Sequence, residues 1–123
     1  MGKKQKSNKI EKFSVVHPNA AGIDVADKEL VVAVPVEAAE ERVQKFGSYT
    51  CDLYDIAQWL KSCGVDTVAM ESTGVYWIQP FLVLQSEGLK PWLVNARQVK
   101  NVTGRKSDEN DAMWLQKLHS CGL

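Results

Sequence analysis

The stretch AGIDVADKELVVAVP, residues 21–35, decides the fold class of this chain. Two apolar runs rich in β-forming residues, Ala21–Val25 and Leu30–Pro35, are separated only by the polar residues 26–29. Two such runs joined by a short polar link are typical of a β-hairpin. The segment Arg42–Phe46 then alternates between polar and apolar residues, which predicts a third strand at the edge of the sheet.

After residue 50 the apolar pattern changes from the period of a strand to that of a helix. Four apolar residues follow the spacing i, i+3, i+4, i+7: Leu53, Ile56, Ala57 and Leu60. This spacing predicts an amphipathic helix. Thr50 is the expected N-cap, and Gly64 is the expected C-terminal stop.

Two further strand–helix units follow. We predict a short strand over Thr67–Met70, a turn at residues 72–74, and a helix from near Val75 to Glu87, with Pro80 in its first turn. A strand over Pro91–Val94 comes next. A short helix opening at residue 95 and a last helix starting at residue 107 complete the pattern. Three meandering strands followed by these units predict an α/β fold with a mixed five-stranded sheet flanked by helices.

Length and composition are those of one globular domain. The chain has 123 residues, 45% hydrophobic and 24% charged. Its 15 basic and 15 acidic residues balance, but five lysines lie within the first twelve residues. We therefore predict a basic flexible tail over residues 1–17 and a single domain over 18–123. A second basic run, without an intervening acid, comprises Arg97, Lys100, Arg105 and Lys106.

Two further features of the sequence bear on membrane association and on the cellular compartment. Its apolar stretches are too short or too interrupted to span a bilayer, so we expect no membrane association. Its three cysteines form no CxxC pair, which favours a reducing, cytoplasmic setting.

Four acidic residues are candidates for one site. Asp24 lies in the first strand and Glu71 at the end of the fourth, so parallel neighbouring strands would bring both carboxylates to one sheet edge. Asp108 and Asp111 are three residues apart, and hence on one face of the predicted last helix. Taken singly, each acid has a commoner explanation as a turn, cap or solvated residue. Their combination in this order of elements points to a shared cleft.

Carboxylates gathered in one cleft repel one another, and divalent cations offset that repulsion. Mg²⁺ and Mn²⁺ prefer oxygen ligands, and a pair of such ions supports phosphodiester chemistry. We therefore expect two ions held by Asp24, Glu71, Asp108 and Asp111. The neighbouring basic run would hold a nucleic-acid backbone, with contacts from Arg97, Lys100, Arg105 and Lys106.

Several motifs resemble one known family. Residues 22–26 (GIDVA), 71–77 (ESTGVYW), 94–95 (VN) and 106–112 (KSDENDA) are similar to blocks of the DEDD transposases of bacterial insertion sequences. That group includes the Piv-type invertases and the RNA-guided bridge recombinases. The resemblance runs from about residue 21 to residue 118.

The resemblance implies an RNase H-like (RuvC-type) N-terminal catalytic domain of a longer transposase, acting in DNA recombination. It implies that the metal-binding and catalytic tetrad is Asp24, Glu71, Asp108 and Asp111. It also implies DNA as partner, a guide or structured RNA in some members, and a homo-oligomer for the complete protein.

Two other functions compete with this reading. An actin-like or sugar-kinase-like ATPase domain also begins with Gly-x-Asp on a first strand followed by a hairpin, but it needs glycine-rich phosphate loops. Residues 72–74 (STG) are the only faint candidate for one. A non-catalytic nucleic-acid-binding module of the same fold is the other alternative, and the presence of all four acids disfavours it.

Overall fold

The structure is a computed structural model that describes residues 15–94 and 110–122. Its elements, in chain order, are β1 (Ala20–Val25), β2 (Leu30–Ala33), β3 (Val43–Phe46), α1 (Thr50–Ser62), β4 (Thr67–Ser72), α2 (Ile78–Ser86), β5 (Lys90–Leu93) and α4 (Asp111–Ser120). The α/β prediction is confirmed. The short helix predicted to open at residue 95 lies outside the described residues.

The strands of the described part form one mixed sheet in the order β3-β2-β1-β4-β5. β1 pairs antiparallel with β2, and β2 pairs antiparallel with β3, so the predicted hairpin and edge strand are both confirmed. β1 pairs parallel with β4, and β4 pairs parallel with β5. In the β1–β4 register Asp24 lies directly opposite Glu71.

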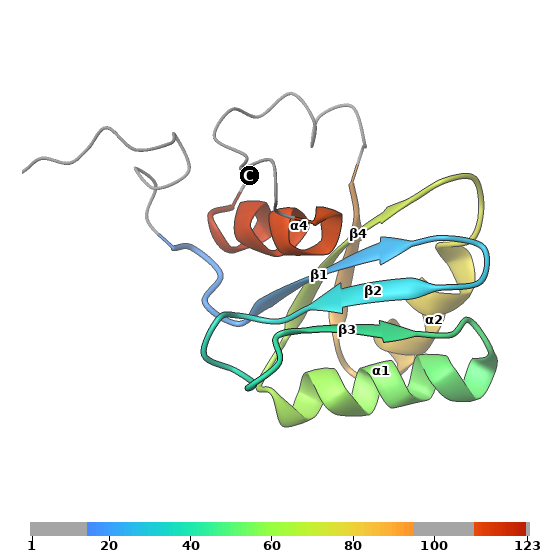
Figure 1. Cartoon of the computed structure of the whole chain (residues 1–123), viewed down its shortest axis with the longest axis horizontal. Coiled ribbons are helices and arrows are strands. Elements are labelled where there is room, and N and C mark those ends of the chain that lie inside the picture. The colour runs from blue at the N-terminus through green and yellow to red at the C-terminus, as the bar shows by residue number, and fades with distance from the viewer. Residues whose placement is uncertain (1–14, 95–109, 123) are drawn as a thin grey trace, which may run out of the picture.

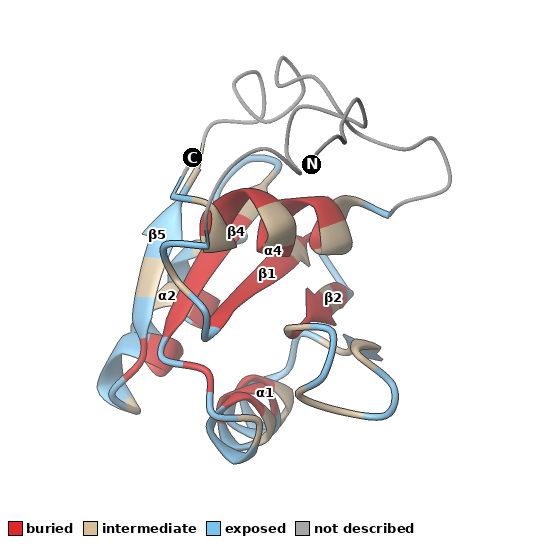
Figure 2. Ribbon diagram, turned by 90° about the vertical axis from the view of Figure 1, so that its left-hand side faces the viewer, coloured by how far each residue is buried: buried red, intermediate tan, exposed pale blue. Residues whose placement is uncertain are grey.

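The two faces of the sheet are covered by different helices. α4 lies on one face, and α1 and α2 lie on the other (Figure 1). Alternate residues of a strand point to opposite faces, so Ala21, Ile23 and Val25 join the core beneath α1 and α2. The four apolar residues predicted to line the inner face of the first helix are all buried there: Leu53, Ile56, Ala57 and Leu60. Figure 2 shows β1 and β4 buried along most of their length between these layers.

α4 approaches β1 unusually closely at Gly22. A Cβ atom added at Gly22 would lie 2.4 Å from the backbone nitrogen of Gln116 and 2.5 Å from the carbonyl oxygen of Ala112. Real Cβ atoms essentially never come so near to backbone atoms. Only glycine therefore allows the helix backbone to rest on the strand at this position.

Several element boundaries differ from the sequence-based predictions. α1 begins at Thr50 with Tyr49 as N-cap, where the backbone N–H of Tyr49 donates to Asp52 Oδ2 at 3.0 Å. α2 begins at residue 78 rather than 75, because a turn containing Gly74 at φ +65° follows β4. Pro80 therefore occupies the first turn of α2, as predicted.

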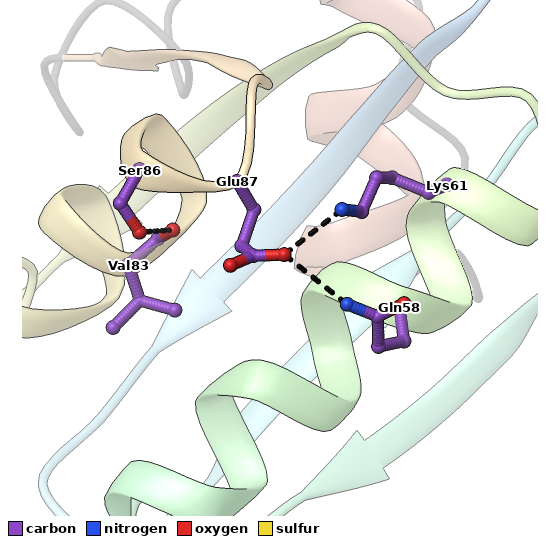
Figure 3. Close-up of polar contacts among 5 residues, drawn as sticks. All are labelled: Gln58, Lys61, Val83, Ser86 and Glu87. Carbon is purple, nitrogen blue, oxygen red and sulfur yellow. Dashed lines mark hydrogen bonds and ion pairs between the residues drawn. The ribbon is translucent and has the colours of Figure 1, made fainter.

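A polar contact joins the C-terminal ends of α1 and α2 (Figure 3). Glu87 Oε1 accepts hydrogen bonds from Lys61 Nζ at 2.9 Å and from Gln58 Nε2 at 3.2 Å. The Lys61 and Glu87 side chains remain partly exposed to solvent, so the contact contributes little to stability.

The packed part of the chain begins before residue 18. The backbone N–H groups of Val16 and His17 both donate to the carbonyl oxygen of Ser120, at 2.7 and 2.8 Å. Both residues fall within the predicted tail over residues 1–17. Their bonds to the last turn of α4 are contacts across the whole chain, which local composition does not reveal.

Substitution Gly22→Ala tests the close approach of α4. The added methyl group meets backbone rather than a flexible side chain, so we expect a loss of at least about 2 kcal/mol in the free energy of unfolding. Urea denaturation measures this loss. Gly47→Ala is the control with a smaller expected loss, because a Cβ there meets the Asp52 carboxylate, which can move at the cost of its hydrogen bond from Tyr49 N–H. Equal effects of the two substitutions would contradict the proposed constraint.

Candidate metal centre

Two carboxylates of the site come from neighbouring parallel strands. Asp24 and Glu71 are paired in register, each one residue before the last residue of its strand. Residues opposite one another in a sheet point to the same face, and Gly22, two residues before Asp24, faces α4. Both carboxylates therefore lie on the α4 face, at the carboxyl ends of β1 and β4.

The third carboxylate belongs to the first turn of α4. Asn110 is the N-cap, with extended backbone at φ −76° and ψ 168°, and its Oδ1 accepts from the backbone N–H of Met113 at 2.8 Å. Asp111 is the first residue of the helix.

The predicted helix start at residue 107 is therefore wrong. Asn110 is extended and caps the helix, so α4 begins at Asp111. Asp108 itself lies outside the described residues, as do the four predicted nucleic-acid contacts Arg97, Lys100, Arg105 and Lys106.

A buried glutamine fixes α4 over the sheet. Gln116 Nε2 donates to the carbonyl oxygen of Ala20 at 3.1 Å, and Gln116 Oε1 accepts from Arg42 Nη2 at 2.9 Å. Arg42 Nε in turn donates to the carbonyl oxygen of Val34 at 3.0 Å. This chain of contacts ties α4 to β1 and to the segment after β2. Sequence reasoning missed it, because its members are far apart in the chain and carry no motif.

The three carboxylates converge on one point. Asp24, Glu71 and Asp111 each offer an oxygen within 4.8 Å of the others, and all three side chains are half-buried. Opposite ligands of Mg²⁺ are about 4.2 Å apart, since each metal–oxygen distance is about 2.1 Å. The oxygens of the cluster thus need only small side-chain movements to share one ion. An all-carboxylate donor set is also the chemistry that Mg²⁺ and Mn²⁺ prefer.

The sequence also matches a known protein family. A family model described as a transposase, the DEDD transposase family of the IS110 type, matches residues 21–120. The chain belongs to this family. No curated protein matches the sequence. The fold is RNase H-like, as both the mixed sheet and the family indicate.

Family membership favours one of the three functions that the sequence left open. It supports a role in DNA transposition, with DNA as partner, and gives the ATPase reading no support. Among the described residues, no helix is both long and apolar enough to cross a membrane.

Substitution Asn110→Ala tests how the cap positions Asp111. Loss of the side-chain acceptor for Met113 N–H should cost about 1 kcal/mol of stability and loosen the first turn of α4. We expect weaker Mn²⁺ binding than in the wild type, measured by isothermal titration. Asn110→Ser, which retains a capping oxygen, is the control and should bind as the wild type does. Unchanged binding in Asn110→Ala would show that the cap does not position Asp111.

Proposed function

We propose that this chain is the catalytic domain of a DNA transposase that cleaves phosphodiester bonds and transfers strands with the help of divalent metal ions. The metal ligands are Asp24, Glu71, Asp108 and Asp111, and residues 18–123 form the domain that carries them. The observation that carries the proposal is the convergence of three carboxylates from β1, β4 and α4.

Secondary structure holds each of the three acids of the cluster in place. Asp24 and Glu71 are fixed by paired strands, so their backbone positions cannot drift independently. Asp111 is fixed by the capped end of a helix whose buried face is bonded to β1. A rigid arrangement of this kind holds metal ligands near the geometry that they need when substrate binds.

Bound Mg²⁺ or Mn²⁺ would activate the attacking oxygen and stabilise the leaving oxygen at a DNA phosphate. The carboxylates would hold the ions, and DNA phosphate oxygens could complete the coordination. The three acids of the cluster suffice for one ion, and Asp108 would complete a site for two.

The basic run is proposed to hold the DNA backbone near these acids. Arg97, Lys100, Arg105 and Lys106 precede α4 in the chain, and Lys106 is five residues before Asp111. Contacts of this type are independent of base sequence and weaken with salt. Because recombination joins two DNA sites, we propose that the complete transposase acts as a homo-oligomer, and a structured RNA is a further candidate partner.

Thermal unfolding with millimolar Mn²⁺ or Mg²⁺ tests the metal site directly. A ligand at about 100 times its dissociation constant adds about 2.7 kcal/mol to the stability of the state that binds it. We expect a rise in Tm for the wild type and none for Asp24→Asn. Asp55→Asn, an exposed carboxylate on α1, is the matched control and should respond as the wild type does. A metal response retained in Asp24→Asn would rule out Asp24 as a ligand.

DNA cleavage by the complete transposase tests the catalytic role. Asp24→Ala, Glu71→Ala, Asp108→Ala and Asp111→Ala should each reduce metal-dependent cleavage by at least about 10²-fold, because each removes a metal ligand. Circular dichroism should show an intact fold. A variant that cleaves normally would remove its residue from the proposed ligand set. A metal response without cleavage by the wild type would instead favour the non-catalytic binding module.

A further inference from the structure

The end of α4 opposite Asp111 holds a second cluster of side chains. There the segment before β1 bonds to α4 through the backbone N–H groups of Val16 and His17, which share the Ser120 carbonyl oxygen. The imidazole rings of His17 and His119 lie against each other, with centroids 5.1 Å apart and planes tilted by 36°. The only two histidines of the chain therefore meet at the contact between its N-terminal segment and α4.

The hydrogen bonds of Thr67 indicate the tautomer of the neutral His119 ring. The Thr67 hydroxyl donates its one proton to the carbonyl oxygen of Lys90 at 3.1 Å. It must then accept from His119 Nε2, which lies 2.8 Å from Thr67 Oγ1. In the neutral ring Nε2 therefore carries the proton, and Nδ1 is the atom at which a further proton would add.

Burial opposes that further proton. His119 is only 8% exposed, and this desolvation lowers the pKa of its imidazole. The neighbouring His17 lowers the pKa of His119 further, and Asp66 raises it. Folding therefore favours the neutral ring, and its contribution to stability is complete above a pH of about 6.5 and is lost as the pH falls below that value.

Other charged groups near the pair tolerate one positive charge but not two. Asp66 lies just before β4, and the C-terminal end of α4 also attracts a cation. Lys90 on β5 and Lys117 on α4 add positive charge at the same end of the sheet. Two imidazolium rings about 5 Å apart repel each other strongly. A cavity of about 230 Å³, lined by both histidines, Trp92 and Gly122 among others, gives water room to reach the rings.

We propose that the His17–His119 contact is a proton-sensitive attachment of the N-terminal segment to α4. When at least one ring is neutral, the segment stays bonded to Ser120 and the rings stay in contact. When both rings carry a proton, the segment separates from the end of α4 while the sheet and the helix remain folded. The attachment is independent of the metal centre, which lies at the other end of the helix.

NMR spectroscopy of the whole chain tests this proposal. The readouts are the nuclear Overhauser effect between the two imidazole rings and the exchange protection of the Val16 and residue 17 amides. As the pH is lowered from about 7.5 until the ring signals show that both imidazoles carry a proton, we expect the ring contact to disappear and amide protection to fall about tenfold or more in the wild type. His17→Phe is the matched variant, because it keeps a ring at this position but cannot take up a proton. Its ring contact and protection should persist over the same pH range.

Each alternative outcome has a clear meaning. A wild type that keeps the ring contact after both histidines have titrated would overturn the proposal. So would His17→Phe losing the contact over the same pH range. The methyl signals of Leu115 and Leu118, which pack with Trp114, report whether the fold survives. Loss of these signals in the wild type over the same pH range would overturn the proposal, because it requires the sheet and α4 to stay folded.

Discussion

The contact between α4 and β1 at Gly22 is the constraint on which the rest of the structure depends. The helix backbone comes so near to the strand that any side chain at residue 22 would collide with it. This approach lowers the first turn of α4 onto the sheet two residues before Asp24, so that Asp111 can reach the carboxylates of β1 and β4. Gln116, bonded to Ala20 and to Arg42, keeps the helix in that position. A larger side chain at residue 22 would move α4 away from the sheet and separate Asp111 from the other two carboxylates.

The two faces of the sheet differ in what they bury: one holds the main apolar core, and the other holds the acidic cluster. On the α1 and α2 face, the apolar residues of β1, β2 and β4 form the larger continuous core, which supplies much of the favourable burial. The α4 face has a smaller apolar cluster around Trp114, and it holds the acids. Gathering carboxylates in a half-buried cluster opposes folding, because like charges repel. The apolar core on the opposite face offsets that cost. The acids can therefore stay close together, an arrangement that is favourable when a cation is bound and unfavourable when none is.

Much of this architecture was predictable because it rests on local pattern. The hairpin, the edge strand, the inner face of α1 and the adjacency of Asp24 and Glu71 all follow from periodicity and strand order. The start of α4 did not, because residues 107–110 (SDEN) are all plausible caps or first-turn residues, and Asn110 takes the capping role. The His17–His119 pair and the Arg42–Gln116 bond also went unpredicted, since both join residues more than 70 positions apart. Such contacts depend on tertiary packing, which local sequence does not encode.

α4 is suited to opposite charges at its two ends. Its positive N-terminal end carries Asp111 of the carboxylate cluster, whereas the carbonyl group of Ser120 at its C-terminal end accepts hydrogen bonds from Val16 and His17. The helix therefore eases the accumulation of negative charge at one end and of one positive charge at the other. Ten residues span only about 15 Å, so the segment bonded to Ser120 and the acid at residue 111 are attached to one short rigid rod. Because Gly22 and Gln116 fix the middle of that rod, release of its C-terminal contact should leave Asp111 in place.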